Sequence, residues 1–525
     1  MELKLLAVSL ILLFSAVGGI FSLIKQLQML QQNSYFPSRY MKWVLNSYSG
    51  ELAVNTFVFC VASLLFATEF YFAEAGLLGA FAIWKIVEAV NVQKTSIKKL
   101  VFTARVKRLL GAALIVFIIL AVLFAIDFRK FTFCIVLAVL FGIVSPLLTL
   151  LIWALTKPIE WAFGKWYIAD AKKILKKQKG LTVIGITGSY GKTTTKFILT
   201  RILSEKYNTL CTPQSFNTPM GVVRTIREQL KPQTQIFVCE MGAKNIGDIK
   251  EICHIVNPDH AIITSVGPQH LDTFKSVDNV FKTKFELADA VKKVGGKCLV
   301  NGECEEISNR ISHRADVIPF GEGTEYFAEN IKYSAQGSTF TLYLGGEKIS
   351  VTTRLLGKHS VADIVAAAAL AHILGVSASD IAFAISALKP TEHRLELKSF
   401  EKGSLLIDDA YNSNPVGCLE AVNILGSFEG MQKAIITPGL IELGEKEYES
   451  NYNLGLAAAK FCDIIILVGK NRSVPMRDAI ATTDFNKDNL YIAGSFKEAL
   501  DIYRAKLNSS SVLLIENDLP DNYLN

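Results

Sequence analysis

The chain has 525 residues, half of them hydrophobic, and a formal net charge of +7. This length corresponds to about three or four domain equivalents. Its nine cysteines are scattered and form no CxxC pair, which argues against a zinc ribbon or a disulfide framework and fits a reducing compartment. The sequence holds no interleaved array of aromatic and basic residues, so the positive charge does not call for a nucleic-acid partner.

The hydrophobic excess lies almost entirely before residue 157. Five apolar segments there have close to the ~20 residues that a helix needs to cross a bilayer. Because little more than residues 69–74 separates the second from the third, we expect four or five crossings. A cleaved signal peptide fits poorly, since the basic region at residues 1–4 is thin. The segments are 3–24, 52–69, 72–90, 109–126 and 131–154.

Basic residues in the short loops set the expected orientation. They follow the first segment and gather between the third and fourth, from Lys94 to Arg108, which places both loops inside. We therefore expect a multi-pass protein of the bacterial cytoplasmic membrane with its catalytic domains in the cytoplasm. Tryptophans and lysines at 158–180 suit either an interfacial helix on anionic membrane lipids or a solvated linker helix. Four acidic residues lie in or beside the apolar segments, either as interfacial charges or as a path for a polar substrate: Glu69, Glu74, Glu88 and Asp127.

From Leu181 onward, apolar runs alternate with helical patterns, which predicts parallel sheets covered by helices. Residues 340–352 predict two antiparallel strands around the Gly345-Gly346 turn, and 361–374 predict an alanine-rich helix. The predicted fold is an α-helical transmembrane bundle followed by two α/β domains, a P-loop domain and a Rossmann-like domain. The expected strands are 183–186, 236–239, 260–263 and 298–300, then 405–407, 434–436, 464–468, 491–493 and 512–515. The expected boundaries are 1–157, 158–180, 181–397 and 398–525.

The strongest motif is TGSYGKTT at 187–194, which follows an apolar run and precedes a helix-compatible stretch. Backbone N–H groups of such a loop cradle phosphates, because glycines let the backbone approach the anion. Lys192 would reach the outer phosphates, and Thr193 would hold Mg²⁺. The spacing departs from the generic motif at Ile186, where a glycine is usual. The motif predicts an ATP site.

Three further residues are candidate site residues because of their positions in the predicted elements. Glu240 ends the second expected strand, and His270 follows the third after a turn. Both should emerge at the carboxyl edge of the sheet, where ligands bind, and a carboxylate there suits Mg²⁺. Lys284 lies within a predicted helix that begins near Ser276, where a lysine is ordinarily a solvated charge. Taken singly, each of the three fits an ordinary structural role.

Taken in order, these elements resemble the Mur ligase family over about residues 181–525. The EMGA loop and the DDAYNSNP element are closest to the MurF branch, the UDP-N-acetylmuramoyl-tripeptide:D-alanyl-D-alanine ligases. The resemblance implies an ATP-dependent amide ligase of peptidoglycan precursor synthesis that works through an acyl phosphate. The matching elements are TGSxGKTT (187–194), EMGAxxxGDI (240–249), HLDxFxSxxxVxxxKxEL (270–287), GxHxxxD (357–363), HR (393–394) and DDAYNSNP (408–415).

The resemblance also implies roles for individual residues. The implied catalytic residues are Lys192, Glu240, His270 and Lys284. The implied ATP contacts are Thr187, Gly188, Ser189, Gly191, Lys192, Thr193, Thr194, Arg394 and Asp409. The implied Mg²⁺ ligands are Thr193, Glu240, His270 and, if it is carbamylated, Lys284. The implied substrate contacts are Asn217, Thr218, Tyr411, Asn412 and Asn414.

Departures from the family leave alternatives open. Ser360 and Asp363 stand where the family usually has asparagines, and Ser265 stands where an asparagine often follows threonine, so the adenine contacts are in doubt. The apolar region replaces the domain that grips the UDP end of the donor. The muramyl-peptide donor is thus either UDP-linked or lipid-linked, and the acceptor is D-alanyl-D-alanine or another amino acid or dipeptide. The alternatives are a ligase of another amino-acid or polyglutamate substrate, a P-loop-driven membrane transporter or regulator, and a scaffold without turnover.

Overall fold

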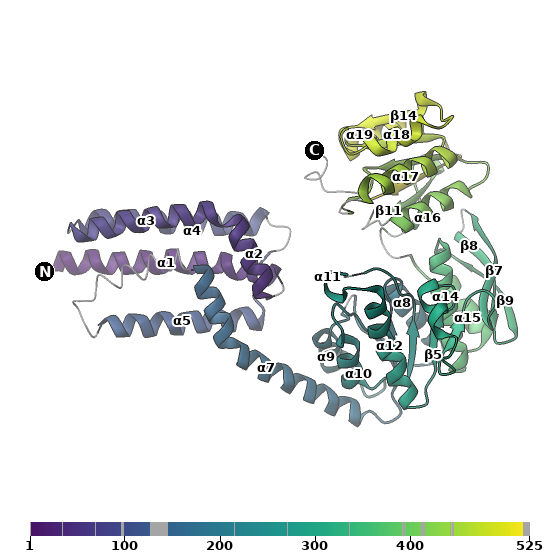
Figure 1. The fold of residues 1–525 in the computed structure, drawn as a ribbon, viewed down its shortest axis with the longest axis horizontal. Coiled ribbons are helices and arrows are strands. Elements are labelled where there is room, and N and C mark those ends of the chain that lie inside the picture. The colour runs from purple at the N-terminus through teal and green to yellow at the C-terminus, as the bar shows by residue number, and fades with distance from the viewer. Residues whose placement is uncertain are drawn as a thin grey trace. The chain divides into compact units, whose positions relative to one another are not determined.

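The structure is a computed structural model that divides into two compact units, Met1–Trp166 and Tyr167–Asn525 (Figure 1). It describes residues 2–517 apart from 34, 69, 96–98, 126–144, 215, 270, 335–336, 391–392, 394, 411–414, 442 and 444–445.

The first unit is helical in its described residues. Helices α1, α3, α4 and α5 contain the first four apolar segments, and most of the fifth lies outside the described residues. α1 packs along α4, and buried apolar side chains form two clusters within the unit. Its helices are α1 (Glu2–Gln32), α2 (Pro37–Ser47), α3 (Ser49–Ala67), α4 (Tyr71–Thr95), α5 (Ala104–Ala125) and the first part of α7 (Ser145–Lys177).

Within the described residues, three helices are long and apolar enough to cross a bilayer, against the four or five expected. They are Ser9–Gln32, Tyr71–Val92 and Ser145–Lys177.

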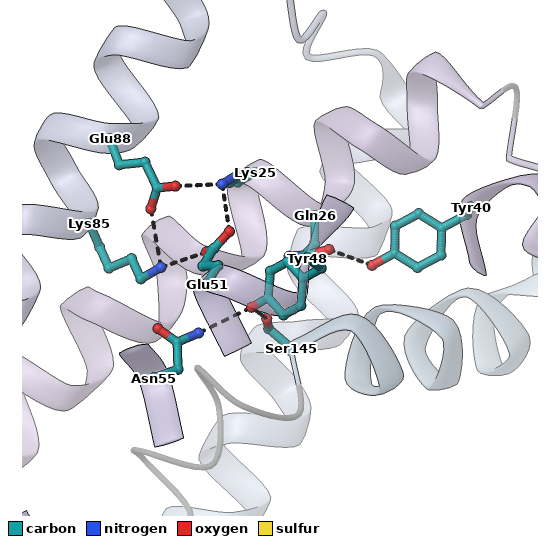
Figure 2. A network of polar contacts seen from close by, with 9 residues as sticks. All are labelled: Lys25, Gln26, Tyr40, Tyr48, Glu51, Asn55, Lys85, Glu88 and Ser145. Atoms are coloured by element: carbon teal, nitrogen blue, oxygen red, sulfur yellow. Dashed lines mark hydrogen bonds and ion pairs between the residues drawn. The ribbon is translucent and has the colours of Figure 1, made fainter. Parts of the chain in front are cut away.

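Two lysines and two glutamates form a closed ion network inside the helical unit (Figure 2). Lys25 Nζ lies 2.6 Å from Glu51 Oε2 and also pairs with Glu88 Oε1. Lys85 Nζ lies 2.5 Å from Glu51 Oε1 and 3.1 Å from Glu88 Oε2, with the Lys85 side chain only 1% exposed. The charges alternate in sign, so each neutralises two neighbours. Glu88 is therefore part of an internal network rather than an interfacial charge.

Neutral polar side chains lie beside this network (Figure 2). Tyr48 OH is 3.1 Å from Ser145 Oγ and accepts a 3.1 Å hydrogen bond from Asn55 Nδ2. Tyr40 OH donates to Gln26 Oε1 over 2.6 Å. These bonds join segments that are distant in sequence. Buried polar groups need such partners, because an unpaired one costs free energy.

The second unit begins with a six-stranded parallel sheet whose order is β2-β3-β1-β4-β5-β6. Apolar side chains of β1 alternate between the two faces, with Val183 in one core cluster and Ile184 in the other. Both faces are buried, which explains why these strands read as continuous apolar runs. The strands are β1 (Thr182–Thr187), β2 (Thr209–Cys211), β3 (Ile236–Glu240), β4 (His260–Ile263), β5 (Cys298–Asn301) and β6 (Ile318–Phe320).

Helices cover this sheet on both sides (Figure 1). α8, α14 and α15 supply one core cluster, and α9, α10 and α12 supply the other. Ser276 caps α12 by accepting a 3.2 Å hydrogen bond from Asn279 N, as the sequence indicated. The helices are α8 (Lys192–Leu203), α9 (Pro219–Gln229), α10 (Asp248–Val256), α11 (Leu271–Phe274), α12 (Val277–Lys293), α13 (Glu305–Ile311), α14 (Lys358–Ile373) and α15 (Ala378–Ser386).

The C-terminal part of α7 packs on the second core cluster. Ala171 is fully buried there, and Tyr167 and Ile174 pack against the same cluster. Arg227 Nε of α9 also donates to Asp170 Oδ2 over 2.7 Å. The stretch expected as an interfacial or solvated helix is therefore partly a docked helix of the second unit.

A three-stranded antiparallel sheet follows, with β8 paired to both neighbours. Its strands are β7 (Tyr326–Ser334), β8 (Gly337–Leu344) and β9 (Glu347–Thr353). The turn at Gly345-Gly346 joins β8 to β9, and both glycines have positive φ, as such hairpin turns require. The predicted hairpin is confirmed.

A second six-stranded sheet completes the unit, in the order β10-β11-β15-β12-β13-β14. β10 is antiparallel to β11, and the other neighbours are parallel. β10 belongs to this sheet although it begins before the boundary expected at 398. The strands are β10 (Glu396–Ser399), β11 (Leu405–Asp409), β12 (Gln432–Thr437), β13 (Ile464–Val468), β14 (Leu490–Ala493) and β15 (Ser511–Glu516). The helices are α16 (Pro415–Gly426), α17 (Glu447–Phe461), α18 (Val474–Ala481) and α19 (Phe496–Lys506).

Candidate active site

The glycine loop connects the end of β1 to the start of α8, and two of its glycines are sterically required. Gly191 precedes α8 with φ of +80°, and a Cβ there would lie 2.5 Å from Asp363 Oδ1. A Cβ at Gly188 would lie 1.9 Å from Thr264 Oγ1. Only glycine suits these positions without displacing neighbours. The backbone thereby reaches the carboxyl edge of the sheet at the N-terminus of a helix, which favours anions.

Hydrogen bonds fasten this loop to the segment that follows β4. Ser189 N donates to Ser265 O over 2.9 Å, and Tyr190 N donates to Ser265 Oγ over 2.8 Å. Gly267 N donates to Ser189 Oγ over 3.0 Å. Ser265, which departs from the family pattern, thus holds the loop through both its backbone and its side chain. The shape of the loop is set before any ligand binds.

Lys192 folds its side chain over the glycine loop. Its Nζ donates to Gly188 O over 2.7 Å and to Ser189 O over 3.0 Å. The ammonium group therefore lies against the loop whose backbone would surround phosphates. A cation held there attracts the outer phosphates of a nucleotide.

Glu240 is fully buried at the end of β3 and receives donors from two other segments. Thr193 Oγ1 donates to its Oε1 over 3.1 Å, and Asn217 Nδ2 donates to the same oxygen over 2.9 Å. Lys196 Nζ lies 3.1 Å from Oε2. The carboxylate thus joins the helix α8 to the loop before α9. Sequence predicted Glu240, Thr193 and Asn217 as site residues, and the structure brings the three together.

Lys284 lies in α12 with only 2% of its surface exposed. Burial, together with a smaller effect of the nearby Lys192 charge, lowers the pKa of its ammonium to about 7. Desolvation disfavours the charged form of a lysine, as does a like charge. A large fraction of this amine is therefore neutral near pH 7, unlike the solvated charge that a mid-helix lysine usually is.

Several predicted contacts have structural partners instead of facing the loop. Thr187 Oγ1 donates to Met241 O over 2.9 Å in the core. Thr218 caps α9 by accepting a 3.3 Å hydrogen bond from Gly221 N. Asp409 Oδ1 accepts a 3.0 Å hydrogen bond from Leu395 N, and Thr194 is half-buried in the first turn of α8. The remaining predicted residues lie outside the described residues: His270, Arg394, Tyr411, Asn412 and Asn414.

The sequence analysis missed Lys196 and the contact of Asp363 with α8. Thr195 Oγ1 donates to Asp363 Oδ1 over 2.8 Å. Burial raises the pKa of the Asp363 carboxyl to about 7, against smaller lowering effects from Thr195, His359 and Lys192. One signal for Lys196 was available. Lys196 lies three residues before Leu199 and seven before Leu203, so helical periodicity places it on the apolar face of α8.

The described residues around the loop suit a magnesium ion bound largely by phosphates and water. Among them, no group of three or more His, Cys, Asp or Glu residues could hold a metal. Thr193 Oγ1 and the Glu240 carboxylate, however, are hard oxygen donors held 3.1 Å apart. Mg²⁺ commonly takes one or two protein oxygens and completes its shell with phosphate and water. This donor set therefore fits Mg²⁺.

Comparisons with known proteins indicate which proteins the chain is similar to. The Mur ligase middle domain matches residues 186–371. A UDP-N-acetylmuramoyl-tripeptide--D-alanyl-D-alanine ligase of Bacillus subtilis (strain 168) is 29% identical over 346 residues, covering 66% of this chain and 74% of that protein. A crystal structure of MurF from Acinetobacter baumannii superposes with a TM-score of 0.57 at 28% identity, covering 66% of this chain and 76% of that one. MurF from Thermotoga maritima in complex with ADP gives a TM-score of 0.58 at 23% identity over 68% and 80% of the two chains, which shows a shared fold.

These relatives correct the predicted localisation. A multi-pass protein of the bacterial cytoplasmic membrane was expected, and this localisation is wrong by comparison with the MurF relatives, which are soluble enzymes of the cytoplasm. The apolar helices that suggested it satisfy only criteria of length and composition. Some apolar side chains of the first unit pack against one another in two buried clusters.

The predicted resemblance and the enzyme class are confirmed, because the relatives are ligases rather than transporters or regulators. The glycine loop, the parallel sheet and the middle-domain match coincide at residues 186–371. Residues 186–371 therefore match a Mur ligase middle domain, and the chain is similar to MurF ligases over about two thirds of its length.

Proposed function

We propose that this chain is the ATP-dependent ligase that joins D-alanyl-D-alanine to a UDP-linked muramyl tripeptide in peptidoglycan precursor synthesis. The observation that carries the proposal is the placement of Lys192, Thr193 and Glu240 around one glycine loop. The names of the Bacillus subtilis and Escherichia coli relatives supply the substrate class. We assign catalysis to residues 181–525, with the nucleotide bound by 181–397 and closed over by 398–525.

The nucleotide is proposed to lie at the N-terminus of α8. The related Thermotoga maritima MurF holds ADP, and residues 187–194 here provide the loop. Lys192 would exchange its bonds to the Gly188 and Ser189 carbonyls for bonds to the outer phosphates. That exchange costs little, because one set of oxygen acceptors replaces another. Arg394 and Asp409 are proposed to contact the nucleotide from the last domain.

Mg²⁺ is proposed to be held by Thr193, Glu240 and His270, where it would neutralise charge on the transferred phosphoryl group. Glu240 is suited to this because three side chains already fix its two oxygens. Lys284 would join as a ligand once CO₂ has converted its amine to a carbamate. Its near-neutral pKa supports that reaction, since only the uncharged amine attacks CO₂.

The proposed reaction has two steps. The donor carboxylate attacks the γ-phosphate of ATP and ADP leaves, which gives an acyl phosphate. The amine of the dipeptide then attacks the acyl carbon and phosphate leaves through a tetrahedral intermediate. Lys192 offsets the charge that develops on the phosphoryl oxygens. Closure of the last domain would exclude water, which otherwise hydrolyses the acyl phosphate.

Asn217 and Thr218 are proposed to form the wall that faces the muramyl peptide. The first is anchored on Glu240 and the second caps α9, so both have fixed positions. Tyr411, Asn412 and Asn414 are proposed to lie near the nucleotide or the incoming dipeptide, from the DDAYNSNP element.

An isotope experiment tests the proposal. The UDP-muramyl tripeptide carries ¹⁸O in its terminal carboxylate, and purified protein is supplied with ATP, Mg²⁺ and D-alanyl-D-alanine. We expect a pentapeptide product with one ¹⁸O transferred to the released phosphate, both detected by mass spectrometry. Product without labelled phosphate would refute carboxylate phosphorylation, and an absence of product would refute the substrate assignment.

A further inference from the structure

Lys196 is a fully buried lysine that lies one helical turn after Lys192 on α8. Its neighbours along the same face are core residues such as Leu199 and Leu203. A lysine rarely occupies such a position unless its charge is paired. The groups that pair with the Lys196 ammonium therefore indicate the role of this residue.

The ammonium group of Lys196 contacts two different segments. Its Nζ lies 3.1 Å from Glu240 Oε2 at the end of β3, and it also donates to the carbonyl of Gln214. Gln214 belongs to residues 212–218, called here the substrate loop because it contains Asn217 and Thr218. Lys196 thus joins α8, β3 and the substrate loop at one nitrogen.

Other bonds fasten the same loop to the same carboxylate. Asn217 Nδ2 donates to Glu240 Oε1 over 2.9 Å, and Gly242 N donates to Asn217 O over 2.8 Å. Glu240 N donates to Thr212 Oγ1 over 3.1 Å. Glu240 is therefore held from the loop at one oxygen and by Lys196 at the other. The hydrogen bonds between the loop and Glu240 therefore fix the positions of both.

Core stability alone does not call for a lysine here. An apolar side chain of similar length would fill the space without the desolvation cost of a buried charge, and such replacements are often neutral or stabilising. A charged amine does what an apolar group cannot, because it donates to a carboxylate and a carbonyl at once. The remaining reason for a lysine here is that its two hydrogen bonds fix the relative positions of the carboxylate and the carbonyl.

We propose that Lys196 is a positioning residue that locks the substrate loop to Glu240, so that the carboxylate beside the nucleotide and the residues facing the donor keep one geometry. The assignment of the substrate loop to donor binding rests on the proposed function. The lock itself consists of contacts among residues of this chain. Lys196 would therefore affect donor binding although it does not touch the donor.

Hydrogen exchange measured by mass spectrometry tests the lock without any substrate. In Lys196→Met we expect the amides of residues 212–218 to exchange at least about tenfold faster, because opening of a segment reports loss of its local contacts. Exchange in β1 and β4 should stay as in the parent protein. Arg201→Met is the matched control, since Arg201 lies on the same helix but pairs with Glu205 at its outer face, and it should leave the loop unchanged.

Kinetics supply the second readout. With Lys196→Met we expect the KM for the muramyl donor to rise about tenfold while the KM for ATP changes by less than threefold. Asn217→Ala should loosen the same loop, and the double variant should add little, because both side chains act through one carboxylate. Lys196→Gln keeps one donor and should give a smaller change in the same amides, which also serves if Lys196→Met does not fold.

Unchanged exchange at 212–218 in the lysine variants would overturn the proposal, and so would an increase spread across the whole sheet. Equal increases in both KM values, or fully additive effects with Asn217→Ala, would overturn it as well. Failure of the proposed function gives a different result. In that case the parent protein shows no turnover that depends on both substrates, whereas the exchange experiment still reports the lock.

Discussion

Thr193 donates a hydrogen bond to Glu240 over 3.1 Å, which joins the first turn of α8 to the end of β3 across 47 positions of sequence. A hydroxyl and a carboxylate are thereby presented side by side next to the glycine loop. Both are hard oxygen donors, and both are already oriented without a ligand. This pair is the geometric basis for placing phosphate and magnesium chemistry at the loop.

Replacing Glu240 with glutamine should both stop catalysis and weaken the fold. The amide leaves the buried Lys196 without its counter-charge, and breaking a buried pair costs about 3–5 kcal/mol. Turnover should fall by about 10²–10³-fold, as expected when charge stabilisation is removed from a site. Urea unfolding and phosphate release measure the two effects. Glu228→Gln is the control, because its pair with Arg224 is largely exposed and should change stability by less than about 0.5 kcal/mol.

Asp363→Asn should stabilise the protein in a pH-dependent way. Burial raises the pKa of Asp363 from its ordinary 3.8 to about 7, so the folded state keeps a proton that the unfolded state loses. Stability conferred by that proton is present below pH 4 and is lost as pH rises through 7. The variant should match the parent at pH 4 and exceed it by about 4 kcal/mol at pH 8. A pH-independent difference in urea unfolding would contradict the assignment, and Asp501→Asn on the surface provides the control.

Lys284→Met should show the opposite dependence on pH. Burial lowers the pKa of this amine from 10.5 to about 7, so the unfolded state holds its proton over that interval. The parent therefore gains stability as pH rises from 7 to 10.5. The variant should be more stable by about 5 kcal/mol at pH 6, with the gap closing near pH 10, while its turnover is lost. Urea unfolding in CO₂-free buffer measures this, and a constant gap would be inconsistent with a buried lysine.

Lys85→Met should loosen the helical unit. The side chain is 1% exposed and pairs with Glu51 and Glu88, so its removal leaves two partly buried carboxylates with one lysine and costs up to about 3–5 kcal/mol. Hydrogen exchange in α3 and α4 should accelerate, and adding Glu51→Gln should restore part of the protection. Lys42→Met, at an exposed position of α2, should change nothing. Unaltered exchange in Lys85→Met would mean that the ion network does not hold these helices.

The sequence predicted nine of the twelve described strands of the two large sheets to within one or two residues. β4 and β13 begin and end where the apolar runs at 260–263 and 464–468 do. Parallel strands buried on both faces read as continuous apolar runs, so their signal is local. Short edge strands such as β2, with three residues, carry too few residues for a pattern. β10 was missed for the same reason.

Contacts between distant segments were the part that sequence could not provide. Thr195 forms a hydrogen bond with Asp363 across 168 positions of sequence, and no local sequence pattern predicts such a contact. Lys196 was missed because a lysine in a helix ordinarily lies in solvent, and the ion network that Glu88 joins was not foreseen in either interpretation of that residue. Thr193, Glu240 and Asn217 were predicted through the family resemblance, which contains tertiary information that composition lacks.

The most direct test of the central claim is phosphate release by the purified chain with ATP, Mg²⁺, UDP-muramyl tripeptide and D-alanyl-D-alanine. The account predicts release that requires both the tripeptide and the dipeptide and that disappears in Lys192→Ala. Release that is indifferent to the dipeptide, or that persists in Lys192→Ala, would contradict a ligase working at the glycine loop.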